Sequence, residues 1–449
     1  MMSMACGRGA LEAFSKYTSH LPRNLPVAVA VSGGCDSLAL TALTAKVFDR
    51  VVGLVVDHKL RDASTEEAAQ ANCLVTELGA QAHTLTLDWG VKGLPEPGKV
   101  QTRARQKRYS ALLEQCQVWG IKTLLVGHHL GDQYENFLHR FAMGSGIEGL
   151  GGMYSISTWP GYPNTKIVRP LLTLKKCDLV EVCRREGLDW VEDPTNKTTD
   201  YVRNHYRNVL EENPVILDGV KQLTKSCYDT RAVISEQVRS HVISLTNINT
   251  KYGYIGVDRA KLLSVTPPIA KRSLSALIRS VMCSPEYQFR YAVLEKSYKT
   301  LMSYDGKPFS VGKAVVAPIT DRTIGIYKSL NHDDSLKSKT PIRPGETILW
   351  ENRWEIQLKP KTTNSQLQEQ YFVRNMGRKE YEFATRGIRR IRSTPLPPVS
   401  ARSSLPVITD AAGRVLLIPH FQFAERNVTI SARVSFEPKY SVEDVLLNH

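Results

Sequence analysis

The run Ser32–Ser37, with the sequence SGGCDS, has the composition of a phosphate-binding turn. Glycines let the backbone approach an anion closely, and backbone N–H groups at a turn before a helix direct their positive ends toward it. The hydroxyls of Ser32 and Ser37 can donate to phosphate oxygens, and Asp36 can hold Mg²⁺ or orient the turn. The run lacks the lysine of a Walker sequence. We therefore expect cleavage between the α- and β-phosphates of a nucleotide, with a plain strand-to-helix turn as the alternative.

A second polar stretch, Gly127–Asn136, has the sequence GHHLGDQYEN. A helix that begins near residue 131 places Asp132 and Glu135 three residues apart on one face. Carboxylates beside a phosphate site can bind Mg²⁺, or hold and deprotonate an amine. Two exposed acids that only complement the helix dipole are the alternative. The position of His129 at the end of a predicted strand favours the chemical interpretation.

Strand and helix patterns alternate through the first part of the chain, which predicts an α/β fold with a doubly wound parallel sheet. Such sheets bind ligands beyond the carboxyl ends of their strands. We expect three polar sets to meet there, namely Ser32–Ser37, Asp57 with His58, and residues 127–129. The predicted strands span 27–31, 51–56, 81–87 and 121–126, and the predicted helices span 36–48, 65–78, 100–118 and 131–141.

The length of 449 residues favours two or three domains. We assign residues 1–213 to the doubly wound catalytic domain and residues 214–330, where helical patterns dominate, to a mainly helical middle domain. Residues 331–340 are polar and rich in lysine and serine, as in a linker. Strand-like alternation follows, so residues 341–449 are predicted to form a small α+β or β-rich C-terminal domain.

A net charge of +15 favours a polyanionic partner such as nucleic acid. The stretch Tyr371–Arg402 adds arginines interleaved with aromatic residues such as Tyr381 and Phe383, a combination that suits phosphates and unstacked bases. A solvated basic face is the alternative. The candidate RNA-binding residues are Arg386, Arg389, Arg390 and Arg392.

Eight cysteines without a CxxC pair argue against a zinc ribbon or a disulfide framework and fit a reducing compartment. No apolar run approaches the roughly 20 residues that span a bilayer, so we expect no membrane partner. The first 26 residues are weakly basic, a faint sign of an organellar transit peptide, although Leu11–Leu21 is more simply the first helix of the following domain. We expect a cytoplasmic bacterial protein, with a mitochondrial or plastid location as the alternative. The sequence leaves open whether the protein forms a homodimer.

Seven motifs in order make the chain resemble the tRNA(Ile)-lysidine synthases of the PP-loop ATP-pyrophosphatase superfamily. The resemblance is strong over residues 11–210 and weaker at residues 396–419, which resemble that family's terminal domain. The motifs are SGGxDS at Ser32–Ser37, VDH at Val56–His58, ARxxRY at Ala104–Tyr109, HHxxDQxE at His128–Glu135, GSGxxGLxGM at Gly144–Met153, RPLL at Arg169–Leu172, and WxEDPxN with YxRNxxR within Trp190–Arg207.

The resemblance implies a substrate, cofactors and site residues. Members of the family use ATP to adenylate the C2 oxygen of the wobble cytidine in isoleucine tRNA with a CAU anticodon, and the amine of free L-lysine then displaces AMP. The product decodes AUA instead of AUG. The implied residues for ATP are Ser32, Gly33, Gly34, Cys35, Asp36, Ser37, Asp57, His58 and His129; those for Mg²⁺ are Asp36 and Asp132; and those for catalysis are Asp36, Asp132, Glu135, Arg108, Arg203 and Arg207.

The chain departs from the family pattern at a few positions. The family usually has an aspartate pair where this chain has Gly131 and Asp132, which removes one potential Mg²⁺ ligand, and threonine where Asn136 stands. Lys59 replaces the usual glycine after VDH, and Met143 replaces the arginine before GSG. The alternatives are another enzyme of the superfamily, such as a thiolase or an amide-forming synthetase, and a tRNA-binding homologue with impaired catalysis. Thiolases of this type tend to need paired cysteines, which the sequence lacks.

Overall fold

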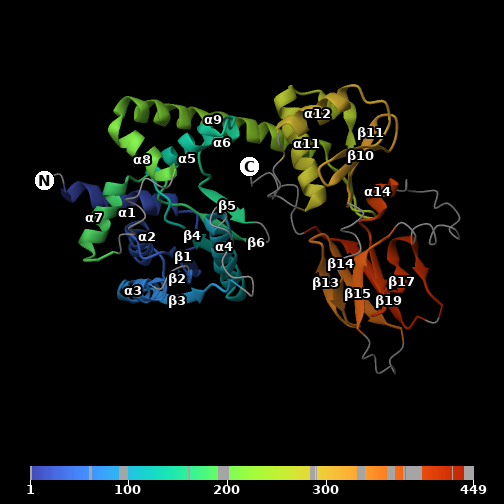
Figure 1. Ribbon diagram of the computed structural model, residues 1–449, viewed down its shortest axis with the longest axis horizontal. Helices are drawn as coiled ribbons and strands as arrows, with labels where there is room; N and C mark the ends of the chain where they lie inside the picture. Colours follow the sequence, from blue (N-terminus) through green and yellow to red (C-terminus); the bar gives the residue numbers. More distant parts are fainter. Residues whose placement is uncertain are drawn as a thin grey trace. The chain divides into compact units, whose positions relative to one another are not determined.

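The chain divides into two compact units, Met1–Val233 and Ile234–His449, which Figure 1 shows coloured along the sequence. A computed structural model describes residues 3–59, 63–89, 100–159, 162–190, 202–283, 289, 291–330, 339–361, 370–377, 380, 397–426 and 428–438. The long helix α9 (Pro214–Leu245) runs through the division. The predicted domain limits at 213, 330 and 341 therefore stay predictions.

The first unit is built on a sheet with the strand order β3-β2-β1-β4-β6-β5. All neighbouring pairs are parallel except β5 with β6, which closes one edge of the sheet in the antiparallel sense. The predicted doubly wound α/β fold is confirmed. The strands are β1 (Val27–Val31), β2 (Val51–Asp57), β3 (Gln81–Thr86), β4 (Thr123–Leu125), β5 (Ile156–Trp159) and β6 (Tyr162–Val168).

Helices cover the two faces of this sheet, which explains why its central strands are apolar throughout. One core joins β1 to α1 (Ser3–Tyr17), α2 (Cys35–Ala45), α3 (Ser64–Glu77) and α7 (Lys176–Arg185). A second core lies between the sheet and α4 (Val100–Val118). Fully buried side chains such as Leu38 and Leu113 each stabilise the fold by about 2 kcal/mol. The strand ends are therefore held rigidly.

A third, smaller apolar cluster joins the helices that follow the sheet. Phe137 of α5 (Leu130–Ala142) packs there with Leu210 of α8 (Val202–Glu212) and Val220 of α9. The short helix α6 (Ile147–Leu150) follows α5 and contributes Leu150 to the rim of this cluster. These contacts fix α5 and α8, which carry two of the predicted motifs.

The second unit combines a helical region with antiparallel sheets, as the sequence predicted. One sheet, β7-β8-β11-β10-β9, packs against α11; the other two have the orders β12-β15-β16-β17-β18 and β13-β14-β19. Strands β7 and β8 are short and were not predicted. The elements are α10 (Arg259–Leu263), α11 (Pro267–Met282), α12 (Tyr291–Met302), α14 (Val399–Arg402), β7 (Asn247–Asn249), β8 (Tyr254–Asp258), β9 (Phe309–Val311), β10 (Ala314–Pro318), β11 (Thr323–Lys328), β12 (Thr340–Ile342), β13 (Thr347–Trp350), β14 (Trp354–Pro360), β15 (Tyr371–Asn375), β16 (Pro406–Thr409), β17 (Val415–Ile418), β18 (Phe423–Ala424) and β19 (Ile430–Phe436).

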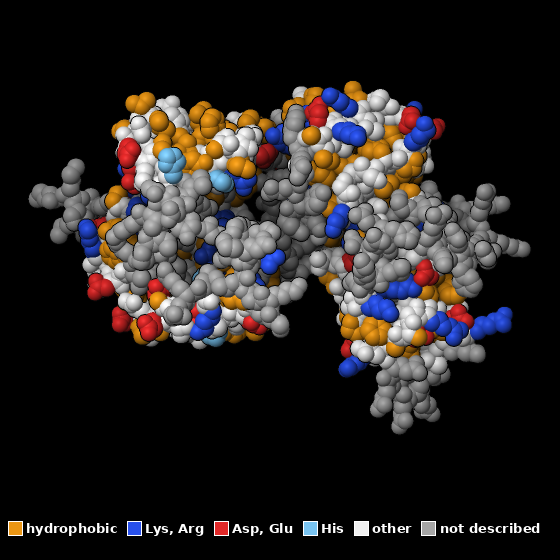
Figure 2. Space-filling view, viewed as in Figure 1, with side chains coloured by type: hydrophobic (Ala, Val, Ile, Leu, Met, Phe, Trp, Pro, Cys, Tyr) orange, Lys and Arg blue, Asp and Glu red, His pale blue; other side chains and the backbone are white. Residues whose placement is uncertain are grey.

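The surface of each unit mixes charged and apolar side chains. Figure 2 shows lysine, arginine and acidic groups scattered among hydrophobic ones on the visible face. Within the described ranges, none of the helices has the length and apolar character that crossing a membrane requires.

Candidate active site

The turn after β1 is closed by the hydrogen bonds of its own serines. Ser37 Oγ accepts from the Ser32 N–H at 3.1 Å and donates to the Gly34 carbonyl at 2.9 Å. Gly33 has φ +79°, a conformation that favours glycine, and a Cβ there would lie 3.3 Å from the Cβ of Ala71. Gly34 begins α2 without a side chain to cover the first helical N–H groups. The serines thus close a tight turn before α2, and its use as a phosphate site stays a prediction from the sequence.

Asp36 lies at the start of α2 between two side chains from distant parts of the sequence. Its Oδ1 accepts from Lys176 Nζ at 2.6 Å, and its Oδ2 lies 3.9 Å from His129 Nε2. About a third of the Asp36 side chain is exposed (32%), so its carboxylate stays accessible to solvent and ligands. Lys176 is the first residue of α7 and was not identified from the sequence.

His129 connects the turn after β1 with the start of α5. Its Nδ1 accepts from the Gly131 N–H at 2.9 Å, so the proton of the neutral ring is on Nε2. Nε2 lies 3.9 Å from Asp36 Oδ2 and 3.8 Å from Asp132 Oδ2. Asp132 Oδ2 also accepts from the His129 N–H at 2.8 Å, which completes a capping box. Two carboxylates from separate motifs therefore face one buried imidazole.

Gly131 makes room for the His129 ring. A Cβ at position 131 would lie 2.7 Å from His129 Cε1 and 3.1 Å from Nδ1, closer than side-chain carbons approach ring atoms. The aspartate that the family usually has here would meet the same ring. The observed orientation of His129 therefore requires glycine at position 131.

Replacing Gly131 by alanine should lower kcat/KM for ATP about tenfold, because the displaced His129 ring loses its contact with both carboxylates. Steady-state kinetics and thermal unfolding measure the effect. Gly219→Ala is the control, since a Cβ at this position in α9 meets nothing within 4 Å. It should leave the kinetics unchanged and stabilise the protein by about 0.5–1 kcal/mol through helix propensity. Unchanged kinetics in Gly131→Ala would show that the ring position is irrelevant.

Glu135 is buried on α5 and forms an ion pair with α8. Its side chain is only 6% exposed, and Oε1 accepts from Arg207 Nε at 2.7 Å. Burial raises the pKa of Glu135, and the hydrogen bond and charge of Arg207 partly offset this rise. The structure thus brings together two of the predicted catalytic residues, 72 positions apart in sequence.

The end of β2 is organised around Asp57. Both of its oxygens are used within the protein: Oδ1 accepts from the Lys59 N–H at 3.0 Å, and Oδ2 accepts from Thr65 Oγ1 at 3.0 Å and lies 3.2 Å from Lys59 Nζ. Burial raises the pKa of Asp57, but the hydrogen bonds from Lys59 and Thr65 outweigh burial and lower it. Lys59 has φ +50°, a conformation that favours glycine. Asp57 therefore shapes the turn that carries His58.

Besides Arg207, the structure describes the side chain of one predicted arginine, Arg108, but not those of several others. Arg108, on α4, faces the end of β2: burial, with the charge of Arg108, lowers the pKa of His58 to about 4. The Cζ atom of Arg108 lies 5.6 Å from the centre of the Tyr109 ring. Arg203 belongs to α8, but its side chain lies outside the described residues. The same holds for all of Arg386, Arg389, Arg390 and Arg392.

The glycine-rich motif after α5 is held by two side chains that the sequence did not single out. Gln133 accepts from the Met153 N–H at 2.6 Å through Oε1 and donates to the Met153 carbonyl at 3.2 Å through Nε2. Arg231, 2% exposed, donates to the carbonyls of Glu148 and Gly152 at 3.2 and 2.9 Å. Gln133 belongs to the HHxxDQxE motif, so the sequence contained a sign of its importance. Arg231 lies in α9 outside every motif, so the sequence contained no such sign.

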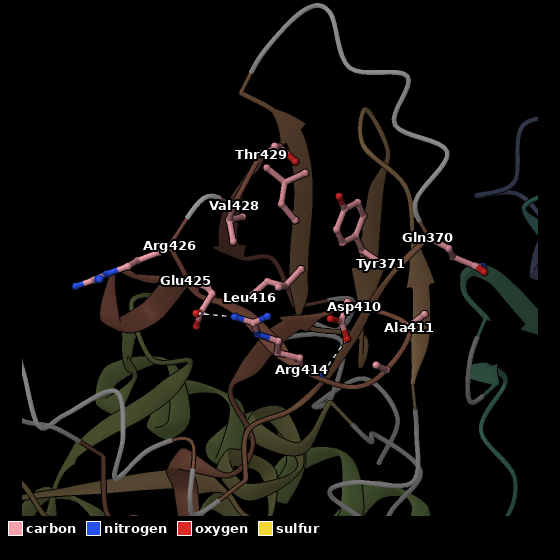
Figure 3. Close-up of a pocket in the computed structure, with 12 residues that line it drawn as sticks. Gln370, Tyr371, Asp410, Ala411, Arg414, Leu416, Glu425, Arg426, Val428 and Thr429 are labelled. Carbon is pink, nitrogen blue, oxygen red and sulfur yellow. Dashed lines mark hydrogen bonds and ion pairs between the residues drawn. The ribbon is translucent and has the colours of Figure 1, made fainter.

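A separate pocket lies in the second unit. It has a volume of about 550 Å³ and is lined mainly by residues before and in β17 (Asp410, Arg414 and Leu416) and by residues between β18 and β19 (Glu425, Val428 and Thr429). Figure 3 shows Arg414 directed toward Glu425, to which its Nη2 donates at 2.8 Å, and Arg426 directed away from the pocket. Because Arg414 is paired with a carboxylate at this rim, the pocket itself is not strongly cationic.

Comparisons with known proteins show what the chain is similar to. Residues 11–213 match the model of the PP-loop domain. The chain is 26% identical over 438 residues to a tRNA(Ile)-lysidine synthase of Orientia tsutsugamushi, covering 93% of this chain and 94% of the relative. It is 32% identical to that of Wolbachia pipientis wMel, covering 74% and 76%. A U34-tRNA thiolase from Methanococcus maripaludis is a solved structure with TM-score 0.42 and 16% identity, covering 51% of this chain and 79% of that one. The chain belongs to the tRNA(Ile)-lysidine synthase family.

Proposed function

We propose that this protein ligates free lysine to C2 of the wobble cytidine in isoleucine tRNA with a CAU anticodon, at the expense of ATP. The observation that carries the proposal is the meeting of Asp36, from the phosphate-binding turn, and Asp132, from the second motif, at the same atom of His129. Glu135 stands three residues beyond Asp132 on α5 and is buried. In this proposal, a phosphate site at Asp36 and an amine site at Asp132 and Glu135 lie on either side of His129.

Mg²⁺ is the cation expected with ATP, and the carboxylates fit it. Among the described residues, groups of three or more His, Cys, Asp or Glu that could hold a metal ion do not occur. Mg²⁺ needs no such cage, because it usually binds one or two carboxylates together with substrate phosphates and water. Asp36 and Asp132 would hold it, and the ion would neutralise charge on the phosphates.

The reaction divides into two steps around these residues. The cytidine C2 oxygen attacks the α-phosphorus of ATP, and pyrophosphate leaves; the N–H groups of the turn and of the start of α2 stabilise the phosphate charge. The lysine amine then attacks C2, the nitrogen loses a proton, and AMP leaves with the oxygen. Asp132 and Glu135 would hold the ammonium group of lysine, and Glu135 would accept the proton that this group must lose before its nitrogen can attack. Arg207, whose Nε donates to Glu135 Oε1, opposes the rise that burial causes in the pKa of Glu135.

Incubation with ATP, radiolabelled lysine and isoleucine tRNA bearing a CAU anticodon tests the proposal. Incorporation of label without a sulfur donor, with release of AMP and pyrophosphate, is the expected result. A requirement for a sulfur donor would support a thiolase. Intact tRNA binding without incorporation of label would support a homologue with impaired catalysis. Methionine tRNA, which shares the CAU anticodon, is the substrate control.

Charge reversal at Arg389 and Arg390 should weaken tRNA binding by at least about tenfold while ATP binding stays unchanged, because phosphate contacts supply much of the affinity for nucleic acid. Filter binding of labelled tRNA and titration with ATP measure the two affinities. Both residues lie outside the described ranges, so this prediction rests on the basic and aromatic composition of the stretch. Unchanged affinity for tRNA would remove this stretch from the proposed interface.

A further inference from the structure

We infer that Lys176 is a phosphate-binding residue, which takes the pyrophosphate portion of ATP at the turn formed by Ser32–Ser37. The inference rests on the proposed function in that ATP is taken as the substrate. The turn contains no lysine of its own, unlike the Walker phosphate loop. The fold brings one from 140 residues away, with Nζ 2.6 Å from Asp36 Oδ1.

The backbone of Lys176 is fixed relative to the turn. Helix α7 packs on α2 in the same apolar core, and Cys183 Sγ donates to the Cys35 carbonyl at 3.3 Å. An ion pair between Lys46 and Glu186 joins the other ends of these two helices. The α-carbon of Lys176 is therefore held beside the phosphate-binding turn by contacts that do not involve its own side chain.

The Lys176 side chain, in contrast, can change partner. It is 50% exposed, and the Asp36 side chain is 32% exposed. Ion pairs with this exposure contribute little to folding stability, so stability does not account for a lysine here. Lysine carries a compact charge on a flexible stem, which suits phosphate oxygens presented at a turn. An ammonium group here also offsets the negative charge of Asp36, which would otherwise repel a polyphosphate.

The position of Lys176 indicates that it contacts the pyrophosphate portion of ATP rather than the nucleoside. The N–H groups at the start of α2, beside Asp36, are the groups proposed to stabilise the phosphate charge of ATP. Lys176 contacts Asp36 and thus lies on the phosphate side. When the bond between the α- and β-phosphates breaks, its charge would stabilise the leaving pyrophosphate.

Titration calorimetry with inorganic pyrophosphate and with AMP, both in MgCl₂, tests the inference on the full chain. Lys176→Met should weaken pyrophosphate binding about tenfold and leave AMP binding within about twofold, whereas Lys176→Arg should stay within about threefold for both ligands. Lys46→Met is the matched control, because it removes the ion pair at the far ends of the same two helices. It should change neither affinity by more than about twofold.

The outcomes separate this inference from the proposed function. Retained AMP binding in Lys176→Met shows that the variant is folded. Equal or tighter pyrophosphate binding by that variant, with normal binding by the wild type, overturns the role of Lys176 alone. Failure of the wild type to bind pyrophosphate, AMP or ATP overturns the proposed function and this inference with it.

Discussion

Replacing Asp36 by asparagine should lower kcat/KM for ATP at least about a thousandfold, which is the largest effect that we expect from a single substitution. The amide keeps the shape of the side chain but removes the negative charge that would bind the Mg²⁺ ion of the nucleotide in the proposed site. It also removes the carboxylate partner of Lys176, at 2.6 Å, and the charge that His129 Nε2 faces at 3.9 Å. Pyrophosphate release and transfer of labelled lysine to tRNA measure the loss.

A change of charge elsewhere near α2 provides the control for Asp36→Asn. Asp49 follows α2, is exposed, and its backbone N–H donates to the Arg23 carbonyl at 3.2 Å, a contact that does not use the carboxylate. Asp49→Asn should leave kcat/KM within about twofold. Thermal unfolding of both variants shows whether the fold is kept. Activity of Asp36→Asn within about tenfold of the wild type would contradict the assignment of Asp36 to the phosphate site.

The parts of the site that the sequence predicted follow from periodicity and topology. The alternation of Val and Ala before Ser32–Ser37 predicted a buried strand, and parallel strands bring their carboxyl ends to the same edge of a sheet. That rule alone placed Asp36, His58 and His129 at a common edge. The resemblance to the family then supplied the chemistry.

The rest of the site depends on which side chains meet, and spacing along the sequence does not contain that information. Lys176 reaches Asp36 only because α7 packs on α2, and Arg231 reaches the glycine-rich motif only through the course of α9. Gly131 had suggested a missing Mg²⁺ ligand. The structure gives it a steric role, because the His129 ring occupies the space that a Cβ would need.

The ion pair between Glu135 and Arg207 should set the acid limb of the pH profile. Burial raises the pKa of Glu135 and Arg207 opposes that rise, so Arg207→Met should raise the pKa further. The ionised fraction of Glu135 near pH 7 then falls. We expect kcat/KM for lysine to drop about a hundredfold at pH 7 and to recover partly toward pH 9, with the acid limb moved to higher pH.

Stability provides a second readout of the same pair. A carboxyl group whose folded pKa is raised contributes stability that is fully present below its unfolded pKa and is lost as the pH rises through the folded pKa. In Arg207→Met the buried carboxylate has no partner cation, so the loss of Tm relative to wild type should be larger at pH 8 than at pH 5. Arg185→Met is the matched control, since Arg185 Nε donates to Glu181 Oε1 at 2.9 Å within the single helix α7.

The control should change neither the pH profile nor the pH dependence of Tm, because an ion pair between neighbouring turns of one helix contributes about 0.3–0.5 kcal/mol. Arg207→Lys keeps a positive charge beside Glu135 and should therefore keep most of the wild-type profile. If Arg207→Met lowers activity equally at every pH, Arg207 acts on the substrate directly rather than through Glu135. A lower activity with a displaced acid limb, together with the growing loss of Tm, would instead establish Arg207 as the residue that holds Glu135 ionised.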